Sequence, residues 1–335
     1  MTAWSERDLI SFFKNNPGAA AHPGVAAGIG DDCAVFRNLE GRDWITTTDM
    51  LVADVHFGYA WHPPRLLGRK SVAVNLSDIA AMGGIPHFAM VSIAIPASVE
   101  ENWITAWYDG ATEMLDTHEC VLIGGDTVKS DVLTFNIVII GSVPQHQAVM
   151  RNGAQPGEHI YVSGPLGSAA AGLEICRQAS RFVPLDAGVS EQIRSRHLDP
   201  EPRLSLGAFL RRGGLVGAMQ DLSDGLATDM AHIADQSGVG AEIDASALPS
   251  EEGLAAVCAI LGTSPTDLQV SGGEDYELLF TVKNGADSDL VARIDEQGLG
   301  PVYKIGRIVE GCGVRLLQGG TSREISFQGY QHSGA

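Results

Sequence analysis

The hydrophobic and polar positions in the first half of the chain alternate between the periods of strands and helices. Apolar runs typical of strands occupy residues 43–52, 88–96, 120–126 and 133–143. Helical periodicity occupies residues 5–14, around 65–83 and 99–117. Strands that alternate with helices of this length predict a first domain of mixed α/β type.

The pattern restarts after a turn region with Gly and Pro at residues 151–159. Beyond it we predict a helix near 167–179 and the strands "IYVSG", "AEID", "ELLFTV" and "VYKIGRIV". A chain of 335 residues is long enough for two domains. We therefore place a boundary near residue 150, between an N-terminal domain (1–150) and a C-terminal α/β domain (151–335).

Composition narrows the class of protein. The 22 basic and 41 acidic residues give a net charge of −19, which disfavours binding to nucleic acid or anionic membranes. The N-terminal residues lack the pattern of a leader, and no apolar stretch approaches the ~18 residues of a membrane span. The five cysteines are widely spaced and suggest neither disulfides nor zinc. We expect a cytoplasmic protein that binds no nucleic acid and no membrane.

Carboxylates recur in short motifs with neighbouring glycines. The stretch "GIGDDCAVF" at 28–36 places Asp31 beside Asp32. "NLSDIAAM" at 75–82 resembles "DLSDGLATDM" at 221–230, and "IGGD" resembles the later "SGGED". We expect most of these carboxylates at the ends of strands or the starts of helices, where α/β proteins bind ligands.

The motif around Asp221 and Asp224 has two interpretations. We expect both residues at a helix start, followed by an apolar stripe of Leu226, Met230 and Ile233. Capping of the helix would explain one such motif. The chain, however, has a surplus of such carboxylates in both halves. Two like charges ~4 Å apart repel by ~4 kcal/mol at an effective dielectric of ~20, so a converging cluster needs a cation.

The chemistry of the ligands favours magnesium and a polyphosphate. Carboxylate oxygens select Mg²⁺, Mn²⁺ or Ca²⁺, and "DLSDG" lacks the ligand spacing of an EF-hand. Mg²⁺ usually takes one or two carboxylates and completes its shell with water and phosphate. The usual nucleotide motifs are absent, since there is no GxxxxGK[ST] and "GIGDDC" does not complete GxGxxG.

Six blocks in a fixed order carry a resemblance to a known family. They are "GIGDDCAVF", "TTTDMLVADVHF", "KSVAVNLSDIAAMGG", "LIGGDT", "DLSDGLATD" and "SGGEDYELLFTV". Together they resemble the bacterial thiamine-monophosphate kinases, related to aminoimidazole ribonucleotide synthetase, selenophosphate synthetase and a hydrogenase maturation protein. The resemblance implies a two-domain aminoimidazole-ribonucleotide-synthetase-like fold of α/β (α+β) class, whose N-terminal mixed sheet pairs across a homodimer.

The resemblance also implies the reaction. ATP would donate its γ-phosphoryl group directly, in line, to thiamine monophosphate, giving thiamine diphosphate in the last step of its biosynthesis. Several Mg²⁺ ions are implied, with K⁺ as a further candidate cofactor. The attacking phosphate has a second pKa of ~6, so no general base is expected. Catalysis would then depend on positioning and charge neutralisation.

Individual residues take roles by the same resemblance. Asp31 is expected to support the turn before Asp32. The implied metal ligands are Asp32, Thr47, Thr48, Asp49, Asp78, Asp126, Asp221 and Asp224, and catalysis is assigned to metal bound at Asp32, Asp49, Asp78 and Asp126. The implied ATP contacts are Tyr108, Gly125, Asp126, Arg151 and Ser223. The implied contacts to thiamine monophosphate are His56, Glu274 and Phe327.

Each candidate outside the set of aspartates also has a purely structural explanation. Arg151 suits bidentate binding of phosphate, but it could be an exposed loop arginine. His56 could satisfy a turn, Glu274 could cap a loop, and Phe327, where relatives often have tryptophan, could be core packing. Lys70 is left outside the site because a lysine on a helix is usually solvated.

Two other functions stay open at this point. One is a different ATP-dependent phosphoryl-transfer enzyme of the same superfamily, which would use another acceptor. Selenophosphate synthetases have a reactive Cys or selenocysteine near a Gly-rich N-terminus, whereas no cysteine precedes Gly28 here. The other is a regulator that binds metal and nucleotide without turnover.

Overall fold

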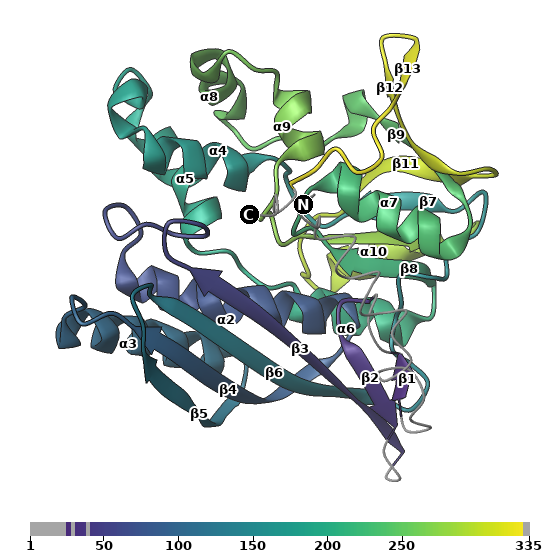
Figure 1. The fold of residues 1–335 in the computed structure, drawn as a ribbon. Coiled ribbons are helices and arrows are strands. Elements are labelled where there is room, and N and C mark those ends of the chain that lie inside the picture. Colours follow the sequence, from purple (N-terminus) through teal and green to yellow (C-terminus); the bar gives the residue numbers. More distant parts are fainter. Residues whose placement is uncertain (1–24, 28–30, 38–40, 331–335) are drawn as a thin grey trace, which may run out of the picture.

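The structure, a computed structural model of the chain, describes residues 25–27, 31–37 and 41–330. The helix expected at 5–14 and the glycines at 28 and 30 lie outside the described residues. Two sheets, each with its own helices, are joined by residues 145–158, the segment in which we place the domain boundary (Figure 1).

The first sheet has six strands in the order β1-β2-β3-β6-β4-β5. Strands β4 and β5 are parallel, and all other neighbours are antiparallel. The bounds are β1 (Val25–Ala27), β2 (Ala34–Arg37), β3 (Arg42–Val52), β4 (Ile85–Ile95), β5 (Val121–Lys129) and β6 (Thr134–Pro144). The four strands predicted in this half are confirmed, as is the mixed α/β class.

Two helices, α2 (Pro64–Ala81) and α3 (Glu101–Thr117), cover one face of this sheet. Helix α2 contacts β3 and β6 on one side and α6 and β8 of the second domain on another. It is therefore buried nearly all round and carries small and apolar residues on every face. Gly68 allows its close packing on α3, since a Cβ there would lie 1.9 Å from the Trp107 carbonyl oxygen.

The second sheet has seven strands in the order β13-β12-β9-β11-β7-β10-β8. Only the pair β9 and β12 is parallel among its described strands. The strand bounds are β7 (His159–Val162), β8 (Val216–Asp221), β9 (Gly240–Asp244), β10 (Leu278–Val282), β11 (Tyr303–Val309), β12 (Gly313–Gln318) and β13 (Thr321–Glu324). The four strands predicted here from sequence are confirmed.

The helices of this half are α4 (Ser168–Arg177), α5 (Ala187–Leu198), α6 (Leu204–Gly213), α7 (Leu226–Ser237), α8 (Leu254–Leu261), α9 (Pro265–Ser271) and α10 (Asp287–Glu296). Some of them pack on the second sheet, whereas α4, α5 and α8 pack on one another to one side of it (Figure 1). One hydrophobic cluster includes Ile79 of α2, Phe209 of α6 and Phe280 of β10. Apolar packing therefore holds the two halves together.

Several acidic residues do not lie where the sequence placed them. Asp221 is the last residue of β8, and α7 begins only at Leu226, so the expectation of a helix start at Asp221 is wrong. Asp49, Asp78 and Asp126 lie inside β3, α2 and β5 rather than at their ends. Short polar residues interrupt the apolar pattern of these elements in the sequence. In the structure the strands stay paired in the sheet and α2 stays buried beyond those residues.

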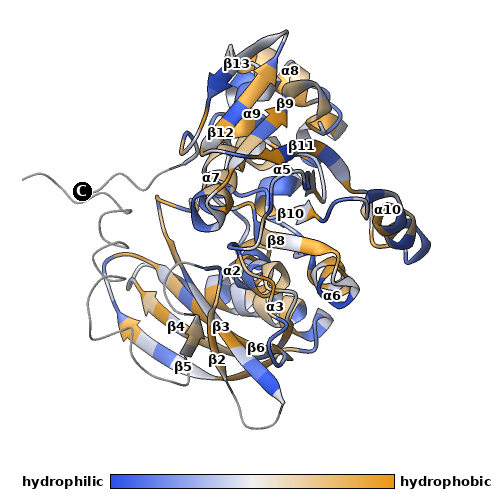
Figure 2. Cartoon of the chain, turned by 90° about the vertical axis from the view of Figure 1, so that its right-hand side faces the viewer, coloured by the Kyte–Doolittle hydropathy of each residue, from blue (hydrophilic) through white to orange (hydrophobic). Residues whose placement is uncertain are grey.

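The other face of the first sheet has no helix over it within the described residues, and Figure 2 shows this sheet with α2 and α3 on one side only. Large apolar side chains are exposed on β3, β4 and β5: Met50, Phe88, Met90, Val121 and Ile123. Among the helices of the described segments, none combines the length and apolar content needed to cross a bilayer.

Candidate active site

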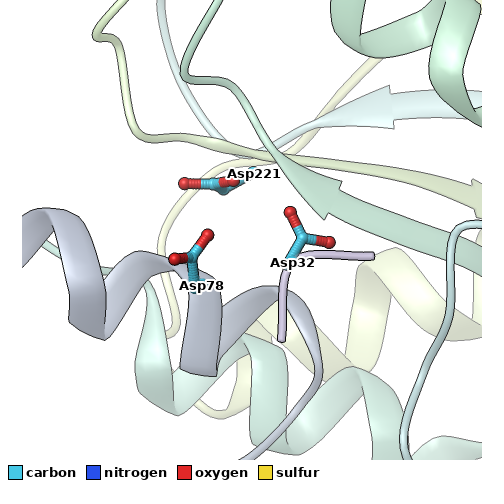
Figure 3. A group of neighbouring side chains, drawn as sticks. All are labelled: Asp32, Asp78 and Asp221. Atoms are coloured by element: carbon cyan, nitrogen blue, oxygen red, sulfur yellow. The ribbon is translucent and has the colours of Figure 1, made fainter. Parts of the chain in front are cut away.

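Three aspartates from distant parts of the chain meet where the two domains pack. Asp32 precedes β2, Asp78 lies on α2, and Asp221 ends β8. One carboxylate oxygen from each lies within 4.8 Å of the others, and Figure 3 shows the three side chains pointing toward a shared space. Asp32 and Asp221 are buried and Asp78 is partly buried. The fold therefore builds a compact carboxylate cluster, which we call the aspartate cluster.

Each aspartate of this cluster has one fixed partner. The Thr47 hydroxyl donates to Asp78 Oδ2, and the Ser77 hydroxyl donates to Asp221 Oδ2 at 2.6 Å. Arg151 binds Asp32 with two contacts, Nη2 to Oδ1 at 2.8 Å and Nε to Oδ2 at 3.2 Å. These partners orient the carboxylates and leave other lone pairs of their oxygens available to a ligand.

The electrostatics of the aspartate cluster favour a bound cation. Burial raises the pKa of Asp78 and of Asp221 well above the usual range, and the charges of the neighbouring aspartates raise both further. The three oxygens lie within 4.8 Å of one another, so one cation between them could be held by all three after small side-chain adjustments. Oxygen donors of this type suit a hard divalent ion. The residues present therefore fit Mg²⁺.

Two more carboxylates lie near the cluster. Burial, followed by the charges of Asp224 and Asp32, raises the pKa of Asp49 to about 6. The Asp31 side chain supports the loop as expected, since it accepts bonds from the backbone N–H groups of Asp32 (3.1 Å) and Arg151 (3.3 Å). Burial, followed by the Asp32 charge, raises the pKa of Asp31 to about 7.

Asp229 is a structural residue of the site that the sequence analysis missed. Its carboxylate accepts bonds from the backbone N–H groups of Asp224 (3.2 Å) and Gly225 (2.9 Å) and from the Gln220 side chain (2.9 Å). The start of α7 is thus capped by Asp229 from inside the helix, while Asp221 turns toward the aspartate cluster. An acidic residue in the first turn of a helix was the available signal.

A cleft of about 880 Å³ opens at Asp49 and Asp224. The three residues of the aspartate cluster do not line it, but Asp49 interacts electrostatically with Asp32 and Asp78 and so connects the cleft with the cluster. The lining of the cleft includes Asp49, His56, Ser223, Asp224 and Glu274, all of which the sequence analysis selected. Both domains contribute to it, and ligand pockets commonly lie at such domain interfaces. The structure therefore brings most of the predicted residues together.

His56 and Glu274 occupy the cleft in different ways. His56 Nδ1 accepts a bond from the Val52 backbone N–H at 3.0 Å, so the ring also closes its own turn. Glu274 has a positive φ of 66° and pairs with Lys70 (3.2 Å) and with His197 (3.0 Å). Lys70 is 1% exposed, so the expectation that it is a solvated helix lysine is wrong.

Four predicted residues lie away from the aspartate cluster. Thr48 lines the cleft, but its hydroxyl donates to Asn136 on β6 at 3.1 Å, because neighbouring strand residues point to opposite faces and Thr47 takes the inner one. Gly125 and Asp126 lie on the edge strand β5, three strands from β3, which is ~14 Å at ~4.8 Å per strand. Tyr108 is 48% exposed on α3.

Phe327 packs at the margin of the second core rather than in the cleft lining. Its ring meets His232 edge-on with a centroid distance of 5.4 Å, and it contacts the second hydrophobic cluster. Its backbone φ of 56° lies in the left-handed region. The following residues Gln328, Gly329 and Tyr330 line the cleft.

Comparisons with known proteins identify the class first. Residues 30–143 match the family "AIR synthase related protein, N-terminal domain", and residues 155–318 match "AIR synthase related protein, C-terminal domain". Two such domains that meet at a carboxylate cluster define this chain as a two-domain AIR synthase related protein.

Full-length relatives then identify the particular family. Thiamine-monophosphate kinase of Bacillus subtilis is 36% identical over 334 residues, which is 98% of this chain and 99% of that protein. The solved structure "AaThiL complexed with AMPPCP and TMP" has a TM-score of 0.83 and 30% identity, over 98% of this chain and 97% of that one. Thiamine-monophosphate kinase from Stenotrophomonas maltophilia K279a has a TM-score of 0.76 and 35% identity, over 92% and 94%. The chain belongs to the thiamine-monophosphate kinase family.

Proposed function

We propose that the protein transfers the γ-phosphoryl group of ATP to thiamine monophosphate, giving thiamine diphosphate and ADP. The observation that carries the proposal is the aspartate cluster, which Asp49 connects with a cleft built by both domains. A member of the same family with a similar fold has been solved with AMPPCP and TMP. The acceptor phosphate is largely ionised near neutral pH, so the chain needs no general base.

Several Mg²⁺ ions would hold the two polyanions together and neutralise their charge. We assign Asp32, Asp78 and Asp221 to hold them, with Asp49, Asp224 and Thr47 beside these three. Thr47 orients Asp78, and Ser77 orients Asp221. The chain itself contributes carboxylates held in place at a domain junction, which would position the metal ions that align the two phosphates in line.

Arg151 and Ser223 are our candidates for contacts to ATP. Arg151 is 17% exposed, and its guanidinium is paired with Asp32 through Nη2 and Nε. A cation at Asp32 would compete for the same oxygens, which frees the guanidinium to bind phosphate in its bidentate manner. Ser223 lines the cleft on the loop between β8 and α7.

His56, Glu274 and Phe327 are our candidates for contacts to thiamine monophosphate. Glu274 supplies a negative charge in the cleft, which suits a thiazolium cation or an amino group. His56 lies in the cleft lining, on the side of β3. Phe327 would need its neighbouring segment to shift before its ring could stack on the substrate, since it now packs against His232.

A second copy of the chain would give Gly125, Asp126 and Tyr108 a role. These residues lie on β5 and α3, away from the aspartate cluster of their own chain. The open face of the first sheet exposes Met50, Phe88 and other apolar side chains without a described cover, as interfaces between identical subunits do before assembly. We therefore propose a homodimer in which β5 of one subunit approaches the site of the other.

Mixed dimers test this part directly. Asp32→Ala and Asp126→Ala should each be inactive alone. If Asp126 serves the partner's site, random mixing of subunits restores about a quarter of the wild-type activity, because half of the dimers then have one intact site of two. A mixture that stays inactive after verified subunit exchange would place both residues in one subunit's site. Asp295→Ala, on the surface of α10, is the matched control for loss of a charge.

Location and monovalent ions complete the proposal. None of the five cysteines, all within the described ranges, forms a disulfide, and four of them are buried. This supports a reducing cytoplasm as the location of the protein.

K⁺ as a cofactor is tested by exchange for Na⁺ at constant ionic strength. A fall in turnover supports K⁺ as a cofactor, and an unchanged rate excludes it.

The main experiment is a mass-balance assay. Purified protein is incubated with ATP, Mg²⁺ and thiamine monophosphate, and thiamine diphosphate and ADP are separated by chromatography. Chelator and unphosphorylated thiamine serve as controls. Equal amounts of both products, dependent on Mg²⁺, would establish the activity. ADP without thiamine diphosphate would favour a sister enzyme with another acceptor, and no ADP would favour a regulator.

A further inference from the structure

Three side chains form a buried network on one wall of the cleft, away from the aspartate cluster. Lys70 comes from α2 in the first domain, His197 from α5 in the second, and Glu274 from the segment between α9 and β10. Lys70 is 1% exposed and His197 is fully buried, whereas 25% of the Glu274 side chain is exposed. Only Glu274 therefore offers an accessible polar group at this position.

The two buried partners use different oxygens of the same carboxylate. Lys70 Nζ lies 3.2 Å from Glu274 Oε1, and His197 Nδ1 lies 3.0 Å from Oε2. Lys70 Nζ also lies 3.4 Å from His197 Nδ1. Because a carboxylate only accepts hydrogen bonds and the contact to Glu274 is the shorter one, we assign the His197 proton to Nδ1. Its Nε2 has no hydrogen-bond partner within the described structure. This agrees with a neutral ring whose pKa is lowered, mainly by burial and next by the Lys70 charge.

The backbone of Glu274 is also fixed. Its φ of 66° lies in the left-handed region, and its N–H donates to the Ser223 carbonyl oxygen at 2.7 Å. The preceding Gly273 approaches the same carbonyl so closely that a Cβ would lie 2.5 Å from it. Left-handed backbone at a residue other than glycine is costly and persists only where the surrounding contacts fix it. Glu274 is thus held by its backbone and by both of its oxygens.

We propose that Lys70 and His197 are positioning residues, which hold the Glu274 carboxylate ionised and oriented so that it binds a cationic or N–H-donating group of the acceptor substrate. The proposal rests on the proposed function, since it gives this carboxylate its task in acceptor binding. A lysine with this burial is stable as a charge only beside a paired anion. Lys70 therefore acts through Glu274 rather than on a phosphate.

A double-mutant cycle tests the proposal. Lys70→Met, which keeps the length of the side chain, should raise the KM for thiamine monophosphate by about 10- to 100-fold, as expected for loss of a hydrogen bond to a charged group. The KM for ATP should stay within about 2-fold of wild type. In a Glu274→Gln background, Lys70→Met should add less than about 2-fold, since the residue through which it acts is already neutral.

Conservative variants of His197 give an independent readout. An Asn side chain can place an N–H near the position of Nδ1, so His197→Asn should retain more acceptor affinity than His197→Ala. Arg65→Met is the matched control on α2, because Arg65 is exposed and pairs with Glu113 at the surface. Thermal unfolding of each variant separates loss of folding from loss of binding. The Lys70→Met/Glu274→Gln double variant removes both charges of the pair together, so it leaves no buried lysine without its partner.

The outcomes separate this proposal from the function on which it rests. Lack of thiamine diphosphate formation by the wild type would overturn the proposed function itself. If the wild type is active but the Lys70→Met effect is equal in both backgrounds, or falls mainly on the KM for ATP, Lys70 binds phosphate directly and the positioning role is wrong. Loss of the Lys70→Met effect in the Glu274→Gln background supports it.

Discussion

Asp221→Asn should make the metal-free protein more stable while it removes metal binding. The substitution keeps an oxygen that can accept the bond from Ser77 and removes one charge from the aspartate cluster. Oxygens of the cluster lie within 4.8 Å, and two charges at that distance repel by ~3 kcal/mol at an effective dielectric of ~20. Arg151 offsets part of the charge of Asp32, so the repulsion removed is that of Asp221 with Asp32 and with Asp78.

The expected change in melting temperature follows from the size of the protein. At ~2.1 cal/mol/K per residue, unfolding of 335 residues has an entropy of ~0.7 kcal/mol/K. A gain of ~3 kcal/mol then raises the melting temperature by ~4 °C. This is an upper value, because protonation of some carboxyls in the wild type already relieves part of the repulsion. Fluorescence-monitored melting in chelator, at about pH 8 where the carboxyls are more fully ionised, measures it.

Metal binding in the same melting experiment tests the role of Asp221. Mg²⁺ with a non-hydrolysable ATP analogue should raise the melting temperature of the wild type and raise that of Asp221→Asn much less, because stabilisation by a ligand grows with the logarithm of its affinity. Asp295→Asn, an exposed charge on α10, should change neither value by more than ~1 °C. A variant that melts lower than wild type in chelator, or responds fully to Mg²⁺, would refute the role given to Asp221.

Three further predictions concern the surroundings of the aspartate cluster. Asp229→Ala leaves two backbone N–H groups without their acceptor and should lower the free energy of unfolding by about 2–5 kcal/mol, measured by denaturant titration; a loss below ~0.5 kcal/mol would contradict its capping role. Gly273→Ala pushes a Cβ against the Ser223 carbonyl and should raise the KM for the acceptor by about 10-fold or more, while an unchanged KM would show that the loop can adjust. The raised pKa values of Asp49 (about 6) and Asp31 (about 7) mean that the folded state binds more protons than the unfolded state between about pH 4 and 7. Their contribution to the stability of the metal-free protein should therefore fall as the pH rises through that window, and saturating Mg²⁺ should flatten the slope; a metal-free stability that rises with pH throughout would contradict these shifts.

The aspartate cluster could be predicted in composition but not in geometry. The recurrence of carboxylates at short motifs indicates a cation site, and Asp32, Asp78 and Asp221 do converge. Their positions within elements could not be predicted, because local pattern does not show that β8 ends at Asp221 or that α2 is buried past Asp78. Those features depend on the contact between the two domains, which forms between residues far apart in sequence.

The network behind Glu274 shows the same limit. Lys70 has no sequence signal that distinguishes it from a solvated helix lysine, and its burial arises because α2 is enclosed by the sheet and by the second domain. His197 lies at the end of α5, more than a hundred residues along the chain from Lys70. The hydrophobic pattern correctly predicts most strands, because the alternation of buried and exposed residues in a strand is visible in a few consecutive residues. Polar contacts between domains join residues far apart in sequence and are visible only in the structure.

The most direct test of the account follows the phosphoryl group itself. ATP labelled in its γ-phosphoryl group is incubated with thiamine monophosphate, Mg²⁺ and either the wild type or Asp78→Asn, and the label is located by mass spectrometry. The account predicts label in the terminal phosphate of thiamine diphosphate with the wild type and none with Asp78→Asn. Label found only in inorganic phosphate, or equal transfer by both proteins, would contradict it.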